Sequence, residues 1–228
     1  MNNKDNKDYY LPISSYDDYL QNLKYYMEYG IITYYSNFKK QDDFGNEALF
    51  RYVYENKLKD NQEQIEKISK KKFATVLKNI RKLVKMDNNL VVASNSPNGI
   101  VYTINYSTEP HGYYITIHHE ILKYLLDTSN EDALKLYVFM CYRCKKGETK
   151  ITLKEMADAI GLSPNSKDNL QKITNITMSF DDNLIKKRYV YETVYDEDTN
   201  KFKTKKFCYY TIMTYEQFKD RNDKQKSD

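Results

Sequence analysis

Apolar and polar positions follow a helical period through residues 70–86, where apolar side chains recur every three and four residues. These apolar side chains are Phe73, Val76, Leu77, Ile80, Leu83 and Val84. Two β-rich runs follow, at residues 89–93 and 100–105, and the turn-forming Asn98 and Gly99 between them predict a hairpin. Weaker helical patterns predict helices before this segment, at residues 16–38, 46–59 and 62–68.

The stretch at residues 151–185 has the pattern of a helix-turn-helix. Thr152 can cap a first helix, and Glu155 three residues later completes a capping box. Gly161 can take the positive φ angle that a tight turn at a helix end requires. A second helix is predicted at residues 165–180, with a buried stripe formed by Leu170, Ile173, Thr177 and Phe180.

A second hairpin is predicted directly after these two helices. Residues 185–213 form an alternating, β-rich and basic run, and the polar residues 196–200 divide it into two strands. A plain helical hairpin is the alternative interpretation of residues 151–180. The order helix, turn, helix and basic hairpin favours a winged helix instead.

The order helices, basic helix and hairpin occurs in both halves of the chain. We therefore predict an α+β, mostly helical protein that consists of two tandem winged helix-turn-helix domains. The halves share no obvious sequence identity, so this prediction depends on the order of the elements alone. We expect a disordered lead at residues 1–15, a first winged-helix domain at 16–106, a linker at 107–112, a second winged-helix domain at 113–220 and a loose tail at 221–228.

The composition of the 228 residues is that of a soluble protein, with 30% charged residues and a mean hydropathy of −0.82. No apolar run approaches the roughly 20 residues that a membrane-spanning helix needs. The first eight residues are polar, so we expect no signal peptide, a cytoplasmic location and no membrane partner.

Basic residues are clustered rather than evenly spread. Eight Lys and Arg residues lie in the segment from Lys67 to Lys85. Clustered positive charge is typical of a surface that binds a polyanion. The alternative is a solvated helix face. The side chains that we expect to contact DNA are Lys70, Lys71, Lys72, Thr75, Lys78, Asn79 and Lys82 in the first half, and Ser163, Asn165, Ser166, Lys167, Asn169, Gln171, Lys172, Asn175, Lys186, Lys187, Arg188, Lys203, Lys205 and Lys206 in the second half.

The three cysteines do not indicate a disulfide framework, because their number is odd. Cys141 and Cys144 form a CxxC inside a helical pattern, whereas a redox pair is expected at a helix N-terminus. Zinc needs about four ligands, and His118, His119 and Cys208 lack the paired spacing of a zinc site. We therefore predict no metal site, no cofactor and no catalytic residue.

Residues 113–166, from YYITIHHEIL through ALKLY to EMADAIGLSPNS, resemble the winged-helix domains of replication initiators and replisome organisers from plasmids and phages of low-GC Gram-positive bacteria. The two-domain plan also resembles the Rep_3 class of initiators. This resemblance implies tandem winged helices that bind repeated origin sites, with one domain able to support dimerisation. It covers the second half of the chain well and the first half only in layout.

The predicted function is sequence-specific binding of double-stranded DNA without catalysis, as a replication initiator of a plasmid or phage. Alternatives are a transcriptional regulator of a mobile element and a protein-interaction module without DNA binding. Further candidate partners are a second copy of the chain and host replication proteins. A nicking initiator is disfavoured because the adjacent His118 and His119 would point to opposite faces of a strand.

Overall fold

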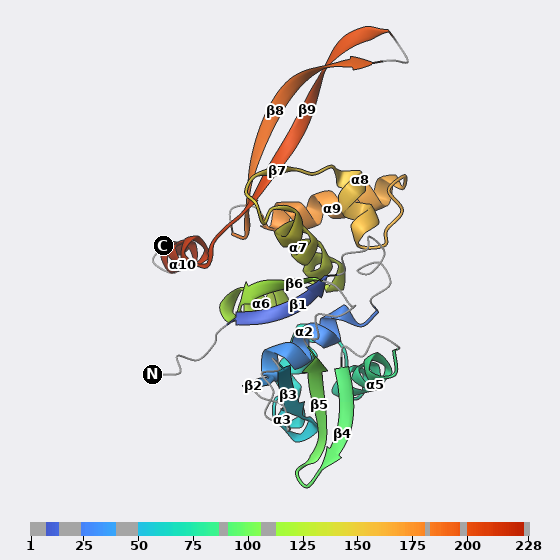
Figure 1. The fold of residues 1–228 in the computed structure, drawn as a ribbon, viewed down its shortest axis with the longest axis vertical. Helices are drawn as coiled ribbons and strands as arrows, with labels where there is room; N and C mark the ends of the chain where they lie inside the picture. Colours follow the sequence, from blue (N-terminus) through green and yellow to red (C-terminus); the bar gives the residue numbers. More distant parts are fainter. Residues whose placement is uncertain are drawn as a thin grey trace. The chain divides into compact units, whose positions relative to one another are not determined.

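The computed structural model describes residues 8–13, 24–39, 50–86, 91–105, 113–180, 183–196 and 200–225. The protein is α+β, with helices and small antiparallel sheets (Figure 1). It divides into two compact units, Met1–Lys135 and Leu136–Asp228, and each is described by itself below. No helix in the described ranges combines the length and apolar character that a membrane crossing requires.

The main sheet of unit 1 has four antiparallel strands in the order β2-β3-β5-β4. Their bounds are Asn37–Lys39 for β2, Phe50–Tyr54 for β3, Val91–Ser96 for β4 and Gly99–Asn105 for β5. β4 and β5 form the predicted hairpin, in which Ser96 pairs with Gly99 across the turn. β3 precedes the helices in sequence but pairs with β5, the second strand of the hairpin.

The helices of unit 1 surround a central helix. This is α2 (Tyr26–Tyr35), of which only Tyr34 is not buried, and it packs against α5 and α6. The helices between β3 and β4 are α3 (Glu55–Asp60), α4 (Gln62–Ser69) and α5 (Phe73–Val84). The apolar stripe predicted for α5 is confirmed, since all its members except the half-buried Val84 are buried.

Unit 1 also contains a two-stranded sheet that the sequence did not predict. β1 (Asp8–Ile13) pairs antiparallel with β6 (Tyr113–His118), and α6 (His119–Thr128) follows. The prediction of a disordered lead at residues 1–15 is therefore wrong for the six residues of β1. β6 and α6 belong to unit 1, and the boundary between the two compact units falls after Lys135. The linker predicted at residues 107–112 lies outside the described residues.

Unit 2 repeats the strand connection of unit 1. It contains most of α7 (Glu131–Arg143), then β7 (Thr149–Lys150), α8 (Leu153–Ala159), α9 (Lys167–Phe180), β8 (Ile185–Asp196), β9 (Lys201–Ile212) and α10 (Tyr215–Gln225). Its sheet has the order β7-β9-β8. The short strand before the helix pair thus again joins the second strand of the hairpin that follows.

The turn between α8 and α9 forms as the sequence predicts. Thr152 and Glu155 make the reciprocal bonds of a capping box at the start of α8. Gly161 has a φ angle of 81°, and its N–H donates to the Asp158 carbonyl at 2.9 Å. The Leu162 N–H donates to the Ala157 carbonyl at 2.9 Å. These two bonds form a Schellman motif, which ends α8 and satisfies its last carbonyls.

Three predicted elements have different bounds in the structure. Residues 50–54, part of a predicted helix at 46–59, form strand β3, and among the described residues of this segment the helix covers 55–60. The helix predicted at 16–38 begins at Tyr26 among the described residues. The tail predicted to be loose from residue 221 continues α10 as far as Gln225.

Candidate nucleic-acid interface

A groove of about 600 Å³ lies in unit 2 between the helix pair and the hairpin. One wall is formed by residues 150–154 at the start of α8, and a second by α9 through Thr174, Thr177 and Met178. The opposite wall is the base of the hairpin, formed by Lys187, Tyr189, Lys206, Phe207, Cys208 and Tyr210. The groove therefore forms only when the helix pair packs beside the hairpin in folded unit 2.

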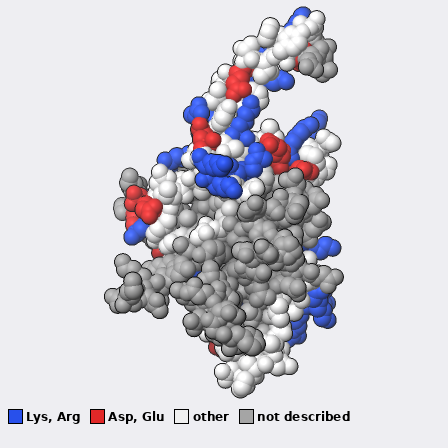
Figure 2. Space-filling view, in the orientation of Figure 1, with Lys and Arg blue, Asp and Glu red and all other residues white. Residues whose placement is uncertain are grey.

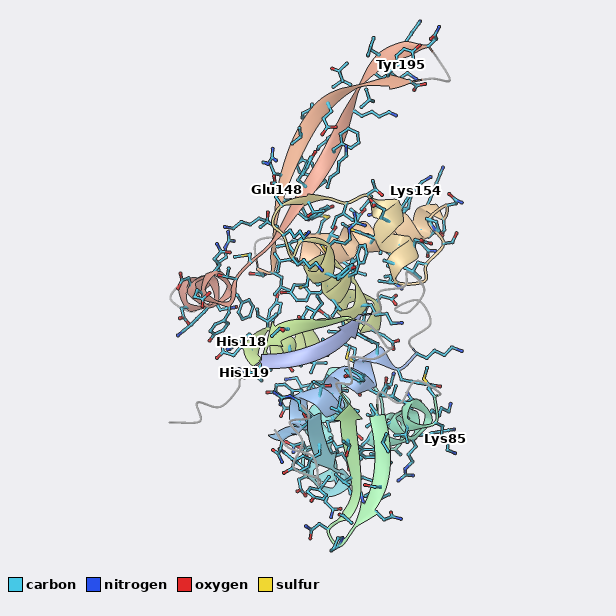
Figure 3. The ribbon with its side chains drawn as sticks, in the orientation of Figure 1. Lys85, His118, His119, Glu148, Lys154 and Tyr195 are labelled. Carbon is cyan, nitrogen blue, oxygen red and sulfur yellow. The ribbon has the colours of Figure 1, made fainter. Side chains whose placement is uncertain are left out.

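Four lysines line this groove, namely Lys150, Lys154, Lys187 and Lys206. Lys154 is exposed at the start of α8 (Figure 3). The Lys206 Nζ lies 3.7 Å from the centroid of the Tyr189 ring, a cation–π contact that positions the ammonium group at the rim. The Lys150 Nζ is engaged elsewhere, 3.1 Å from Glu192 Oε2. Lys154, Lys187 and Lys206 add positive charge to the lining of the groove, which is suited to a phosphate backbone.

The exposed face of α9 borders the groove. Gln171, Asn175 and Met178 lie three or four positions apart, so they form one stripe on the helix. The Gln171 Nε2 donates to Asn175 Oδ1 at 3.0 Å. This bond leaves the Gln171 carbonyl as an acceptor and an Asn175 N–H as a donor, and adenine presents the complementary pair in the major groove. Met178 is 64% exposed and adds an apolar group next to these amides.

Other predicted contact residues stabilise the start of α9. The Ser166 Oγ accepts from the Asn169 N–H at 3.3 Å, as an N-cap does. The Asn169 Nδ2 donates to the Ser163 carbonyl at 3.3 Å. The bonds among Ser163, Ser166 and Asn169 therefore stabilise the turn before α9. Asn165, Lys167 and Lys172 are exposed in the same region.

The remaining predicted residues of unit 2 lie on the hairpin of β8 and β9. The two strands carry seven Lys or Arg and two Asp or Glu, a net charge of +5. Figure 2 shows basic side chains along the hairpin and at its base. Arg188 pairs with Glu148 and holds the pKa of that carboxyl below its usual range. The Lys203 Nζ lies 2.7 Å from Asp196 Oδ2. Lys186 and Lys205 are exposed.

In unit 1, the predicted contact residues in α5 and in the three residues before it divide into two groups. The Lys71 Nζ and the Asn79 Nδ2 donate to the same oxygen of Glu28, at 2.7 and 2.8 Å, and this carboxylate is fully buried. Those two residues therefore tie α5 to α2. The outward side chains are Lys70, Lys72, Thr75, Lys78 and Lys82, all exposed. The hairpin of this unit, β4 and β5, contains no Lys or Arg.

Sequence reasoning missed three residues of the interface. Lys150 and Lys154 flank the start of α8 and reach the groove because that helix begins beside the hairpin. Met178 was assigned neither to the buried stripe nor to the predicted contacts, although it lines the groove. Its position one residue after the buried Thr177 could have indicated its exposure, since the predicted stripe had already assigned Thr177 to the buried face.

The CxxC pair is not built for thiolate chemistry. Burial raises the pKa of the Cys141 thiol to about 12, and it also raises the pKa of Cys144. Reactive cysteines have lowered pKa values instead. Within the described ranges, no three His, Cys, Asp or Glu side chains gather as a metal site would require.

We compared the chain with known proteins, and no protein-family model, curated protein or solved structure matches it.

Proposed function

We propose that the protein binds double-stranded DNA in a sequence-specific manner through two winged helix-turn-helix units. The observation that carries this proposal is the lysine-lined groove between α9 and the hairpin of unit 2. In a winged helix, the second helix of the pair enters the major groove and the hairpin flanks it. Lys154, Lys187 and Lys206 would then contact phosphates while Gln171 and Asn175 contact base edges.

The strand connection supports the same plan for both units. In each unit a short strand joins the second strand of the hairpin that follows, with three helices between strand and hairpin in unit 1 and two in unit 2. α5 and α9 occupy equivalent positions in this order, and each exposes basic or amide side chains. Unit 1 differs because its hairpin lacks basic residues, so its DNA contacts would come from α5.

The biological role that we propose is replication initiation on a plasmid or phage, with transcriptional regulation of such an element as the other role. Both use the same DNA-binding chemistry. Mapping the bound sites across the host and element genomes separates them, because an initiator should occupy repeats at an origin and a regulator should occupy promoters.

We expect the affinity for duplex DNA to depend on the salt concentration. If the groove and the adjoining elements neutralise five or six phosphates, log affinity for duplex DNA should fall against log salt with a slope of about −5. Lys154→Glu combined with Lys206→Glu should weaken binding and make the slope shallower by about 2. The measurement is fluorescence anisotropy of labelled duplex DNA between about 50 and 200 mM salt.

Lys219→Glu is the control for each single groove substitution, because it makes the charge change of one Lys→Glu at an exposed position of α10 that does not line the groove. It should leave the slope nearly unchanged. The absence of duplex binding at low salt, or an equal effect of Lys219→Glu and the groove substitutions, would contradict the proposed function.

A further inference from the structure

The hairpin of unit 2 exposes an unusual number of large rings on one side. Antiparallel pairing places Tyr195 opposite Phe202 and Tyr191 opposite Lys206, and paired residues point to the same side of a sheet. Tyr189 and Tyr191 share this side with Tyr195 because they are separated from it by even numbers of residues. We call these four residues, Tyr189, Tyr191, Tyr195 and Phe202, the aromatic face.

The rings of the aromatic face are exposed by 54%, 68%, 50% and 73% for Tyr189, Tyr191, Tyr195 and Phe202. The Tyr195 and Phe202 rings contact each other edge to face with centroids 5.3 Å apart, yet Phe202 remains the most exposed of the four. The labelled Tyr195 lies near the far end of the hairpin (Figure 3). Single exposed apolar residues are ordinary, but several exposed rings on one side of a hairpin mark a binding surface.

The charge of the hairpin selects the class of partner. Its net charge of +5 favours a polyanion over a basic or neutral protein surface. The Lys206 ammonium group lies over the Tyr189 ring, on the same side as the aromatic face. Lys187 and Lys206 are the two lysines of these strands on this side. Proteins bind single-stranded nucleic acid by combining positive charge with aromatic rings, because bases stack on the rings and lysines contact the phosphates.

The aromatic face is continuous with the groove. Lys187, Tyr189 and Lys206 line the groove and lie on the same side of the hairpin as Tyr191 and Phe202. DNA held in the groove can therefore pass directly onto this face. In a duplex the bases stack on one another and their faces are covered, whereas an unpaired strand exposes them.

We propose that the aromatic face binds single-stranded DNA that continues from a duplex held in the groove. Tyr191 and Phe202 are the principal stacking residues, since their rings are the most exposed, and Lys206 contacts the phosphate between them and the groove. The inference rests on the proposed function for the position of the adjoining duplex. It goes beyond that function because it assigns a second form of DNA to a surface that base pairs cannot use.

The first test compares an unpaired oligothymidylate of about 20 nucleotides with a blunt duplex of equal length, both measured by fluorescence anisotropy. Tyr191→Ala combined with Phe202→Ala should weaken oligothymidylate binding by about a hundredfold, or about tenfold for each ring. Binding of the blunt duplex should stay within about twofold of the unsubstituted protein, since stacking is the interaction removed. Val194→Ala, on the other side of the hairpin, is the control and should change neither affinity.

The second test uses the absence of tryptophan from the sequence. Phe202→Trp introduces a single indole into the aromatic face, and stacking of a base on it should quench its fluorescence when oligothymidylate is added. Val194→Trp places an indole at the neighbouring position on the opposite side and should not be quenched. Equal quenching at both positions, or none at Phe202→Trp, overturns the inference.

The outcomes separate this inference from the proposed function. Binding of oligothymidylate without binding of the blunt duplex would support the aromatic face and remove the duplex function. Binding of the duplex alone would do the reverse, and so would binding of both DNAs that the double alanine substitution leaves unchanged. A dimer that the double substitution converts to a monomer, with DNA binding unchanged, would assign the rings to a second copy of the chain and overturn the inference.

Discussion

The charge of Glu55 connects three elements of unit 1. Its buried carboxylate accepts from the Tyr102 hydroxyl at 2.7 Å and from Arg81 at 3.3 Å, and it pairs with Lys59 at 3.1 Å. Burial raises the pKa of Glu55, but the bonds from Tyr102, Lys59 and Arg81 outweigh that effect and lower the pKa below its ordinary value of 4.5. This carboxylate therefore links α3 to α5 and β5.

We expect Glu55→Gln to destabilise unit 1 by about 1–3 kcal/mol at neutral pH, because it removes the charge that binds Arg81 and Lys59. A lowered folded pKa gives stabilisation that is present above the unfolded pKa and lost as the pH falls through the folded pKa. The difference between the two proteins should thus narrow below pH 4.5. Thermal denaturation followed by circular dichroism from pH 7 downward measures it, and a difference that stays constant with pH would rule out the charge as the cause.

Only some residues of the candidate site could be predicted from the sequence. Gln171 and Asn175 could be predicted as base-contacting side chains, because they are amides and lie outside the buried stripe. The sequence could not show that Asn169 donates to the Ser163 carbonyl, because that bond depends on the conformation of the turn. Lys154 was missed for a similar reason, since its proximity to the hairpin is a contact between elements far apart in the chain.

At the level of elements, the strongly periodic segments were predicted best. α5 and the two hairpins follow from local pattern and turn chemistry, and the structure confirms them. β3 was mistaken for helix because Leu49, Phe50, Val53 and Tyr54 have the spacing of one helix face. Pairing with both β2 and β5 makes residues 50–54 a strand. β1 was missed because its partner β6 lies about a hundred residues further along the chain, which no local pattern reveals.

Two substitutions on or near α9 distinguish side chains that contact bases from side chains that stabilise the helix. Gln171→Ala should cost about 1–3 kcal/mol on the cognate DNA and little on random DNA, because its side chain faces outward. Asn169→Ala should weaken binding to both DNAs and lower the thermal stability of unit 2, because its amide stabilises the turn before α9. Paired measurements of affinity and melting temperature distinguish the two. Identical behaviour of both variants would show that the stripe on α9 does not face the bases.

At the scale of the whole molecule, the question is whether both units bind the same duplex. Unit 1 offers Lys72, Lys78 and Lys82 on the outward side of α5, and unit 2 offers Lys154, Lys187 and Lys206 around its groove. The two sets contain three lysines each, which makes them a matched pair for comparison. They differ in their surroundings, because only the second set lies beside a basic hairpin.

If both units contact one duplex, changing either set of three lysines to Ala should make the salt slope shallower by about 2.7, since each lost phosphate contact contributes about 0.9. Changing all six should remove about 5.4, because contacts at separate sites add. Anisotropy measured across a salt series gives the slopes, and unchanged melting temperatures show that the variants remain folded. A slope that responds to the unit 2 set alone would mean that α5 does not contact that duplex, and the exposed lysines of α5 would then be a solvated helix face.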